Sequence, residues 1–551
     1  ETFPVGTRVD FLQQRYGSFY PKPGSKLMER VSRRIAEVFN ACEGDGVYFD
    51  GAEGMMTRYG TEVGRETTFR KLRNANDSII CESACLYPYS WWYRSRIGPW
   101  DAAEWGAKRF IDEHIRCLDE YANKANFLRV NLGWWQPMMS CRMARGHYTD
   151  EMEYCGAKGA GVDAADGFQL PRIDMSINVK PVFFNTEDQL TVFGWWERAR
   201  LARAFPEETL AKLRVPGDEY RLRQDEAGLW RIAPQTVDEH RIADAYGSKW
   251  TVRAPAKRKA ELRVAALFGA NGYADADSYS ILAPSDAKDL AVTAAEGVST
   301  KGAEAKDAEK GETLAIEATN ANGFRDGAWT RVAKHYPLPY CGVTNAVGLW
   351  VKGDASGALL NVQLEQAIAK YHGYSEHYIR LDFSGWRYFA LHLRERDAYE
   401  YPRHKWPYSH NRLNTATEVY RTEMFGQTIE YVNLWLNDVP ANGRTRVEVT
   451  DVRAIGRHPI EIADAVVTLN GKKIPVPFAL RSEEYAELAD GVWTKFSAKG
   501  EPQEKCSNVR MIECLNVDSG TCELAWSGKA GNEYPRAEVT LLTVGEGEPA
   551  F

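Results

Sequence analysis

The stretch Gly46-Val47-Tyr48-Phe49-Asp50 decides the fold that we expect. It is a short apolar run followed by the loop Gly51-Ala52-Glu53-Gly54, a pattern typical of a buried strand, and its last residue is a carboxylate. Residues 25–42 before it carry apolar side chains at helical spacing, and Ser25 follows Pro23-Gly24 in an N-cap position. The sequence therefore predicts a helix that leads into a buried strand ending in an acid.

The same pattern returns three times further along the chain. Residues 77–82 read as a strand that ends in Glu82, residues 126–132 as a strand that ends before Gly133-Trp134-Trp135, and residues 164–170 as a weaker strand. Strands that alternate with helices form parallel sheets, and a TIM barrel carries its functional groups at the carboxyl ends of such strands. Because a full barrel needs eight strands, we expect the C-terminal half of a (β/α)8 barrel, completed by an upstream segment or a second chain.

The rest of the chain predicts β structure. Beyond Pro216 helical periodicity becomes rare and short alternating stretches take over. We divide the chain into the half-barrel (residues 1–215), a β linker or subdomain (216–260), a galactose-binding-like β-sandwich (261–457) and a small C-terminal β domain (458–551). Within these, the polar run 299–312 is expected to be a loop, and Asn470-Gly471 a hairpin turn. The predicted fold class is thus α/β followed by all-β.

Composition excludes several classes of protein. The chain is 44% apolar and 26% charged, and no apolar run approaches the ~20 residues that span a bilayer. A formal net charge of -7 gives no electrostatic reason to bind nucleic acid. The first residue is Glu1 rather than Met, so we expect a processed or truncated product, and we place it outside the cell or in the periplasm. The 17 Trp and 27 Tyr residues offer rings that suit sugars.

Asp50 and Glu82 are the candidate catalytic pair. Hydrolysis of a glycosidic bond needs one carboxyl group that protonates the leaving oxygen and a second that acts as nucleophile or activates water. The two residues are about one strand-helix-strand repeat apart, so adjacent parallel strands would bring both to the same end of a barrel. In the alternative interpretation, Asp50 caps a turn and Glu82 forms a structural ion pair.

A resemblance supports the catalytic interpretation. Tyr48-Phe49-Asp50-Gly51-Ala52-Glu53, followed by Glu82 one repeat later, resembles the barrel of the endo-α-N-acetylgalactosaminidases and their exo-acting relatives, glycoside hydrolase families 101 and 129. The resemblance covers about residues 20–200. It implies that Asp50 is a nucleophile on the fourth barrel strand, that Glu82 is an acid/base on the fifth, and that configuration is retained. The α-galactosidase clan takes its acid from the sixth strand, where this chain has Asn131, and that contrast favours Glu82.

Several further residues are candidates for contact with the substrate. Tryptophan rings in loops at strand ends can stack on the CH face of a sugar, and an amide at a strand end can bond its hydroxyls. The candidates are Glu53, Trp91, Trp92, Asn131, Trp134 and Trp135. The alternatives are a loop salt bridge for Glu53, a strand-end turn for Asn131, and one core ring in each tryptophan pair. A third pair, Trp195-Trp196, lies in a helical context.

Metal and sandwich motifs are weaker. We expect no required cofactor and no catalytic metal, although Ala274-Asp275-Ala276-Asp277 could serve a structural calcium ion. Residues 382–389 are similar to a phrase that recurs in galactose-binding-like carbohydrate modules, but burial with period two predicts core packing for alternate aromatic side chains in it.

The candidate acids predict a glycoside hydrolase, and the resemblance implies that it is a retaining enzyme that cleaves an α-linked sugar of galacto or N-acetylgalactosamino type from a glycan. An inverting hydrolase or polysaccharide lyase that uses the same acids is one alternative. A non-catalytic carbohydrate-binding protein is another. The predicted partners are an oligosaccharide or glycan and the segment that completes the barrel, with no nucleic acid and no membrane span.

Overall fold

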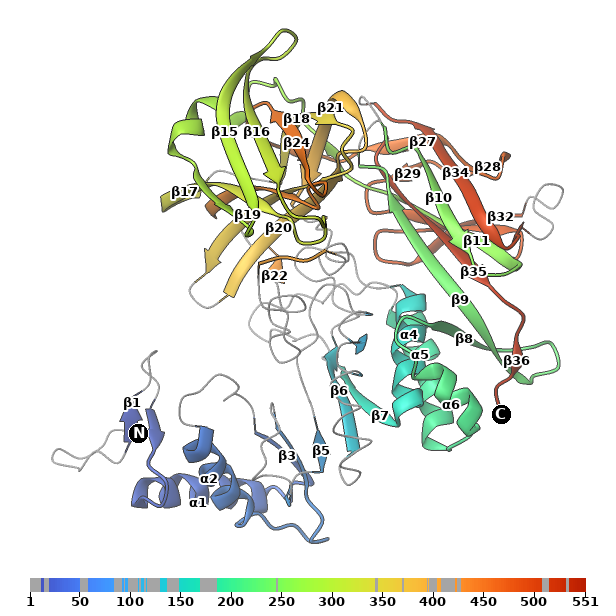
Figure 1. Cartoon of the computed structure of the whole chain (residues 1–551). Helices are drawn as coiled ribbons and strands as arrows, with labels where there is room; N and C mark the ends of the chain where they lie inside the picture. The colour runs from blue at the N-terminus through green and yellow to red at the C-terminus, as the bar shows by residue number, and fades with distance from the viewer. Residues whose placement is uncertain are drawn as a thin grey trace.

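The computed structural model describes residues 11–13, 19–49, 58–83, 92–93, 95–97, 108, 111–112, 115, 129–135, 148–168, 186–243, 246–341, 345–368, 371–393, 395, 404–407, 422–423, 428–507, 515–531 and 535–551. These residues are mostly β-sheet and include two units of facing sheets (Figure 1). The predicted β-sandwich architecture is therefore confirmed. The predicted half-barrel is not shown, because the parallel strands described within residues 46–168 form short separate sheets. No described helix has the length and apolar character that a membrane crossing needs.

Helix α1 spans Lys26–Ala41 and begins where the sequence predicts. The Ser25 side chain accepts a hydrogen bond from the Met28 amide at 3.1 Å, which satisfies one of the unpaired N–H groups of the first turn. Helix α1 buries Met28, Ser32 and Ala36. Its contact with α2 (Arg58–Phe69) uses the side that carries Ser32, whose hydroxyl accepts a hydrogen bond from Thr68 at 3.0 Å. The predicted apolar stripe is instead exposed at Val31 (41%), Ile35 (44%) and Val38 (52%).

The first part of the chain holds two parallel sheets and a hairpin. Strands β3 (Gly46–Phe49) and β4 (Ile80–Ser83) pair in parallel, and β5 (Arg96–Ile97), β6 (Arg129–Trp135) and β7 (Ala164–Phe168) form a second parallel sheet. The predicted strands at residues 46–50 and 164–170 contain β3 and β7, and those at 77–82 and 126–132 overlap β4 and β6, which end one and three residues later. Strands β1 (Phe11–Gln13) and β2 (Phe19–Pro21) pair antiparallel.

Helix α4 (Thr149–Val162) lies between β6 and β7 in the chain, and α5 (Thr186–Leu201) and α6 (Glu207–Leu213) follow β7. Gly156 allows α4 and α5 to approach, since a Cβ atom there would lie 2.6 Å from the Trp196 side chain. Trp196 is fully buried, so this ring of the third tryptophan pair belongs to the core. The helices pack on β8 and β9 through a shared apolar cluster that includes Leu222 and Ile232.

The first β unit consists of two facing sheets around one core. Its seven-stranded sheet runs in the order β13 (Tyr279–Leu282), β25 (Val452–Ile455), β18 (Ala346–Asp354), β24 (Gly443–Val449), β16 (Gly311–Asn320) and β15 (Val298–Asp307), and β21 (Ser384–His392) pairs with β18. The six-stranded sheet runs in the order β14 (Ala291–Ala294), β17 (Thr330–Cys341), β23 (Thr428–Asn437), β19 (Leu359–Ile368), β20 (Tyr371–Arg380) and β22 (Thr422–Glu423). A short 3-10 helix, Pro284–Asp289, precedes β14.

The second β unit combines strands from distant parts of the chain. Its nine-stranded sheet contains β32 (Pro502–Ser507), β31 (Val492–Phe496), β30 (Tyr485–Ala489), β11 (Arg258–Ala266), β35 (Ala537–Val544), β9 (Trp230–Arg241) and β36 (Glu548–Pro549), with β33 (Asn516–Val517) on β11 and β8 (Glu219–Gln224) on β9. Its five-stranded sheet contains β10 (Lys249–Ala254), β34 (Gly520–Lys529), β27 (Glu461–Leu469), β28 (Lys472–Pro475) and β29 (Leu480–Arg481). A two-stranded ladder, β12 (Gly269–Ala270) with β26 (Arg457–His458), lies between the two units in the chain. The segments predicted as 216–260 and 458–551 thus contribute strands to the same sheets.

Two local predictions in the β region have opposite outcomes. Asn470 and Gly471 both have positive φ, at 48° and 80°, and connect β27 to β28 as the predicted hairpin turn. The predicted loop at residues 299–312 is wrong, because β15 and β16 form an antiparallel hairpin there. Strand β15 lies at the edge of its sheet and carries polar side chains along most of its length, which is why it does not read as a strand.

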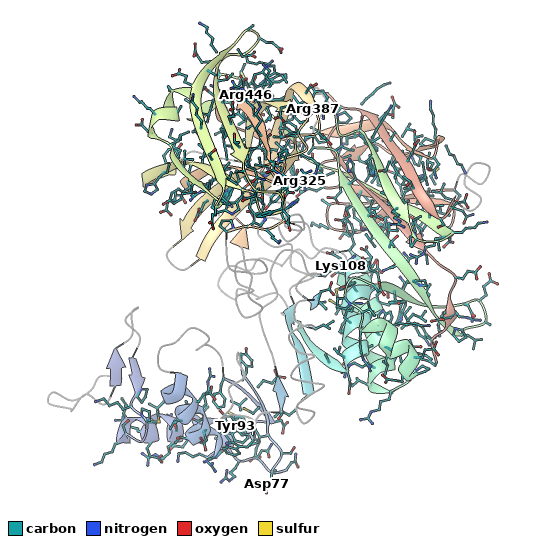
Figure 2. The ribbon with its side chains drawn as sticks, viewed as in Figure 1. Asp77, Tyr93, Lys108, Arg325, Arg387 and Arg446 are labelled. Atoms are coloured by element: carbon teal, nitrogen blue, oxygen red, sulfur yellow. The ribbon has the colours of Figure 1, made fainter. Side chains whose placement is uncertain are left out.

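A buried ionic cluster joins the helices to the second β unit. The Arg263 guanidinium on β11 donates to Asp150 Oδ1 at 2.6 Å and to Glu487 Oε1 at 2.7 Å. Lys108, labelled in Figure 2, lies 2.9 Å from Glu219 and 3.8 Å from Asp150 Oδ2. Burial raises the pKa of Asp150, but the charges of Arg263 and Lys108 outweigh it and bring the pKa down to about 2.

The Asp150→Asn variant tests this cluster. Loss of the charge leaves Arg263 with one acidic partner in a buried place, and we expect the free energy of unfolding to fall by about 3 kcal/mol in urea denaturation at pH 7. The folded-state pKa of Asp150 is depressed, so its stabilisation is present above the unfolded value of 3.8 and is lost as the pH falls toward 2. The difference in the free energy of unfolding between wild type and variant should therefore narrow from about pH 4 downward, by about 2 kcal/mol in total. Asp464→Asn, which breaks an exposed pair with Lys529, is the control and should change little. A difference in the free energy of unfolding that is small at pH 7, or that widens in acid, would contradict the stabilising role of Asp150.

Candidate functional site

Strands β3 and β4 hold the predicted catalytic region. They pair in parallel with Tyr48 opposite Glu82 and Phe49 opposite Ser83. The spacing of the two acids predicts that their strands are parallel neighbours, and this pairing confirms it. Glu82 is half-buried on β4. Asp50 follows β3 directly in the sequence, and both Asp50 and Glu53 lie outside the described residues.

Ser95, which follows β4 in the chain, forms hydrogen bonds with β4 next to Glu82. The Ser95 amide donates to the Cys81 carbonyl at 2.8 Å, and the Cys81 amide donates to the Ser95 hydroxyl at 3.1 Å. Strand β5 begins at the next residue and pairs in parallel with β6. The two parallel sheets are thus connected at Cys81, the residue before Glu82.

A buried polar cluster on α2 holds the segment that follows β4. The Tyr93 hydroxyl donates to Glu62 Oε2 at 3.0 Å, and Arg65 Nη1 donates to Glu62 Oε1 at 2.8 Å. Glu62, Arg65 and Tyr93 are all buried, and the Tyr93 ring packs 5.1 Å from the Phe69 ring. Figure 2 labels Tyr93 among the side chains of this first α/β part. Because a buried carboxylate needs hydrogen bonds, the cluster holds the chain beyond β4 against α2.

Trp92 is the predicted substrate-binding residue that the structure describes most fully. Its side chain is 39% exposed, and the Arg70 guanidinium lies 4.3 Å from the centre of its ring. The ring also meets Phe69 edge-on, with centroids 6.2 Å apart. One face of Trp92 is therefore taken by a cation.

The other predicted contacts are only partly described. Asn131, Trp134 and Trp135 lie on β6, where Asn131 is opposite Ala165 of β7, and their side chains are outside the described part of the structure. Trp91 lies outside the described residues as well. The structure thus places Glu82, Trp92 and strand β6 in the α/β part of the chain. The described contacts do not bring the Glu82 and Trp92 side chains together.

The acidic loop that suggested calcium is engaged in turns. Asp275 Oδ2 accepts a hydrogen bond from the Gly272 amide at 2.7 Å, and Asp277 Oδ2 accepts one from the Asn271 side chain at 3.0 Å. Within the described ranges, no group of three or more His, Cys, Asp or Glu residues is placed to hold a metal ion. A structural calcium ion remains a prediction.

The segment 382–389 packs as the period-two pattern predicts. Phe383 and Phe389 are buried in the core of the first β unit. Trp386 lies on the opposite side of β21, where its Nε1 atom donates to Asp307 Oδ1 at 3.2 Å.

The structure also gathers residues that the sequence patterns did not single out. Arg331, Gln363, Glu376 and Asn433 come from four strands of the six-stranded sheet and form one hydrogen-bonded chain on its outer face. A signal existed in residues 431–437, Tyr-Val-Asn-Leu-Trp-Leu-Asn, where polar and aromatic side chains alternate strictly with apolar ones.

Comparison with known proteins gives structural likenesses alone. No family model and no curated protein matches the chain. A family 11 carbohydrate-binding module of a Clostridium thermocellum cellulosomal cellulase is 11% identical over 32% of this chain and 94% of its own, with a TM-score of 0.24. A mannan-recognising carbohydrate-binding module, TmCBM27, is 10% identical over 35% of this chain and 100% of its own, with a TM-score of 0.19. An exo-β-agarase is 8% identical over 33% of this chain and 25% of its own, with a TM-score of 0.21. At these scores the likenesses carry no conclusion about ligand or activity.

The Tyr93→Phe variant tests the cluster on α2. It removes the hydroxyl that donates to Glu62, a buried carboxylate, so we expect the free energy of unfolding in urea to fall by about 1–3 kcal/mol. The matched control is Arg34→Gln, which breaks the exposed pair with Glu37 on α1 and should have little effect. Equal stability of Tyr93→Phe and wild type would show that the hydrogen bond does not hold this segment.

Proposed function

We propose that this chain is part of a carbohydrate-active enzyme, a retaining glycoside hydrolase that cleaves an α-linked sugar of galacto or N-acetylgalactosamino type. The observation that carries the proposal is the parallel pairing of β3 and β4 with Tyr48 opposite Glu82. Parallel strands present their carboxyl ends at the same edge of a sheet, which supports the proposal that the acids at the ends of these two strands share one site. The resemblance of residues 48–53 to glycoside hydrolase families 101 and 129 supplies the reaction.

In this proposal Asp50 attacks the anomeric carbon while Glu82 donates a proton to the departing oxygen. Glu82 then takes a proton from the water that releases the sugar from Asp50. Neighbouring strands lie about 4.8 Å apart, a spacing at which two carboxyl groups can flank one glycosidic bond. Retention of configuration follows from the resemblance, because strand spacing alone suits both retaining and inverting enzymes. A secreted or periplasmic location would give such an enzyme access to its glycan.

The proposed barrel needs further strands, from an upstream segment or a second chain. The exposed apolar side chains of α1 support this. Val31, Ile35 and Val38 follow one another at helical spacing and are each more than two-fifths exposed, whereas a helix in a closed barrel buries such a stripe. Helix α1 is therefore the surface on which we expect the completing segment to pack.

The roles of Asp50 and Glu82 can be told apart by how the activity of each variant depends on the leaving group of the substrate. Asp50→Asn removes the nucleophile and should lower kcat/KM by at least about 10³-fold on every aryl α-glycoside, activated or not. Glu82→Gln removes the acid and should lower kcat/KM by about 10²–10⁴-fold on a glycoside with a poor leaving group, but far less on a dinitrophenyl glycoside, whose departure needs little protonation. Both values of kcat/KM are measured with the full-length protein, from the rate at which the aryl alcohol is released from the glycoside.

Glu37→Gln is the matched control, since Glu37 is an exposed acid on α1 that pairs with Arg34. It should retain wild-type kcat/KM. Full turnover by Asp50→Asn would overturn the proposal. Equal losses for Glu82→Gln on both kinds of leaving group would remove Glu82 from the acid/base role.

A further inference from the structure

The outer face of the six-stranded sheet is built differently from an ordinary solvated sheet surface. Strand β23 turns Val432 and Leu434 into the core of the first β unit, and by alternation Asn433 and Trp435 lie on the other side. Asn433 and Trp435 are nevertheless buried. In Figure 1 strands β17, β19, β20 and β22, which belong to this sheet, are labelled below β15, β16 and β18 of the facing sheet.

A continuous polar network occupies the middle of this face. Gln363 Oε1 accepts from Asn433 Nδ2 at 2.7 Å and from Trp435 Nε1 at 3.1 Å, and Gln363 Nε2 donates to Glu376 Oε1 at 2.8 Å. Asn433 Oδ1 accepts from Arg331 Nε at 3.0 Å and from Arg331 Nη2 at 2.8 Å. Each amide has one fixed orientation, and the network holds the Arg331 guanidinium in place. Such preorganised polar side chains are what a binding site requires.

Asn361 adds unused hydrogen-bonding capacity to the same face. It lies opposite Trp435 on one neighbouring strand and opposite Tyr378 on the other. Its side chain is 1% exposed, and within the described part of the chain its Oδ1 atom accepts no hydrogen bond. A buried acceptor without a donor costs about 1–3 kcal/mol, but Asn361 lies between Trp435 and Tyr378 at the covered end of the face and is therefore not one of the proposed contacts.

One end of the face is covered and the other is open. The Trp406 ring packs 5.9 Å from the rings of both Trp435 and Tyr378 at the covered end. At the open end the His335 and Tyr431 rings stack 4.6 Å apart, and the His335 side chain is 48% exposed. The Arg331 guanidinium lies 5.2 Å from the centre of the Tyr431 ring. A flat ring pair and a fixed guanidinium thus meet at the edge of a buried amide network.

We propose that this face is a binding site for a neutral oligosaccharide, with Tyr431, His335 and Arg331 as contact residues. A sugar offers a CH face for the ring pair and hydroxyl groups for the Arg331 guanidinium, which the buried amides hold in place. A peptide that extends a sheet needs an unpaired strand edge, whereas β23 and β19 are paired on both sides. Glu376 and Glu365 lie on the same face as Arg331, which disfavours an anionic ligand. The site is separate from Asp50 and Glu82 and does not depend on their chemistry.

Affinity electrophoresis of the full-length protein tests the site. The gels contain mixed-linkage β-glucan, mannan, agarose or a mucin glycopeptide, which together cover gluco, manno, galacto and N-acetylgalactosamino sugars. We expect wild type to be retarded by at least one of them. On that glycan Tyr431→Ala and Arg331→Ala should each raise Kd about tenfold or more, whereas Tyr431→Phe, which keeps the ring, should stay within about threefold of wild type.

Arg446→Ala is the matched control. Arg446, labelled in Figure 2, lies on β24 of the opposite sheet, where it pairs with Glu448 at 3.1 Å. It should bind as wild type does. Thermal unfolding of each variant separates the site from a structural role, since Tyr431→Ala and Arg331→Ala should lose affinity even where Tm is unchanged. The proposal is overturned if wild type binds none of the four glycans, if both alanine variants keep wild-type Kd, or if Arg446→Ala loses affinity equally. None of these outcomes depends on turnover, so each leaves the hydrolase proposal standing.

Discussion

The alternation of side chains along a β-strand is the constraint on which most of this structure depends. On β23 it sends Val432 and Leu434 into the core and leaves Tyr431 and Asn433 on the outer face. A slip of one residue would exchange the two sets and place amides in the core. The core of the first β unit and the polar network on its outer face are therefore two results of a single register.

Register also governs the proposed catalytic region, although the strands there are short. Backbone pairing of β3 with β4 sets Tyr48 opposite Glu82, and the Cys81–Ser95 hydrogen bonds link this pair to the next parallel sheet. Buried ion pairs then connect the helices and the two β units. Arg263 connects the helices to the second β unit, and Arg536 connects that unit to the first through Glu395, at 2.5 Å. Breaking a buried pair leaves an uncompensated charge, so these contacts specify position even where their net stabilisation is small.

Features that depend on neighbouring residues could be predicted from the sequence. The Ser25 cap, the Asn470-Gly471 turn and the alternation of strand and helix near Asp50 are of this kind. Partners distant in the chain could not. Strand β10 pairs with β34, which lies more than two hundred residues later, and alternation alone does not choose a partner. The outer-face network was missed for the same reason, because its residues come from four strands that only the folded sheet brings together. The edge strand β15 was missed because polar residues on both faces remove the apolar signal.

The proposed enzyme depends most on the assignment of Asp50 as nucleophile. The most direct measurement is to trap the enzyme with an activated fluorinated α-glycoside, whose glycosyl ester with the enzyme is hydrolysed slowly, and to locate the adduct by peptide mass spectrometry. The account predicts one added sugar on the peptide that contains Asp50, and none in the Asp50→Asn variant. An adduct on another carboxylate, or turnover of α-glycosides with no covalent adduct and with inversion of configuration, would contradict it.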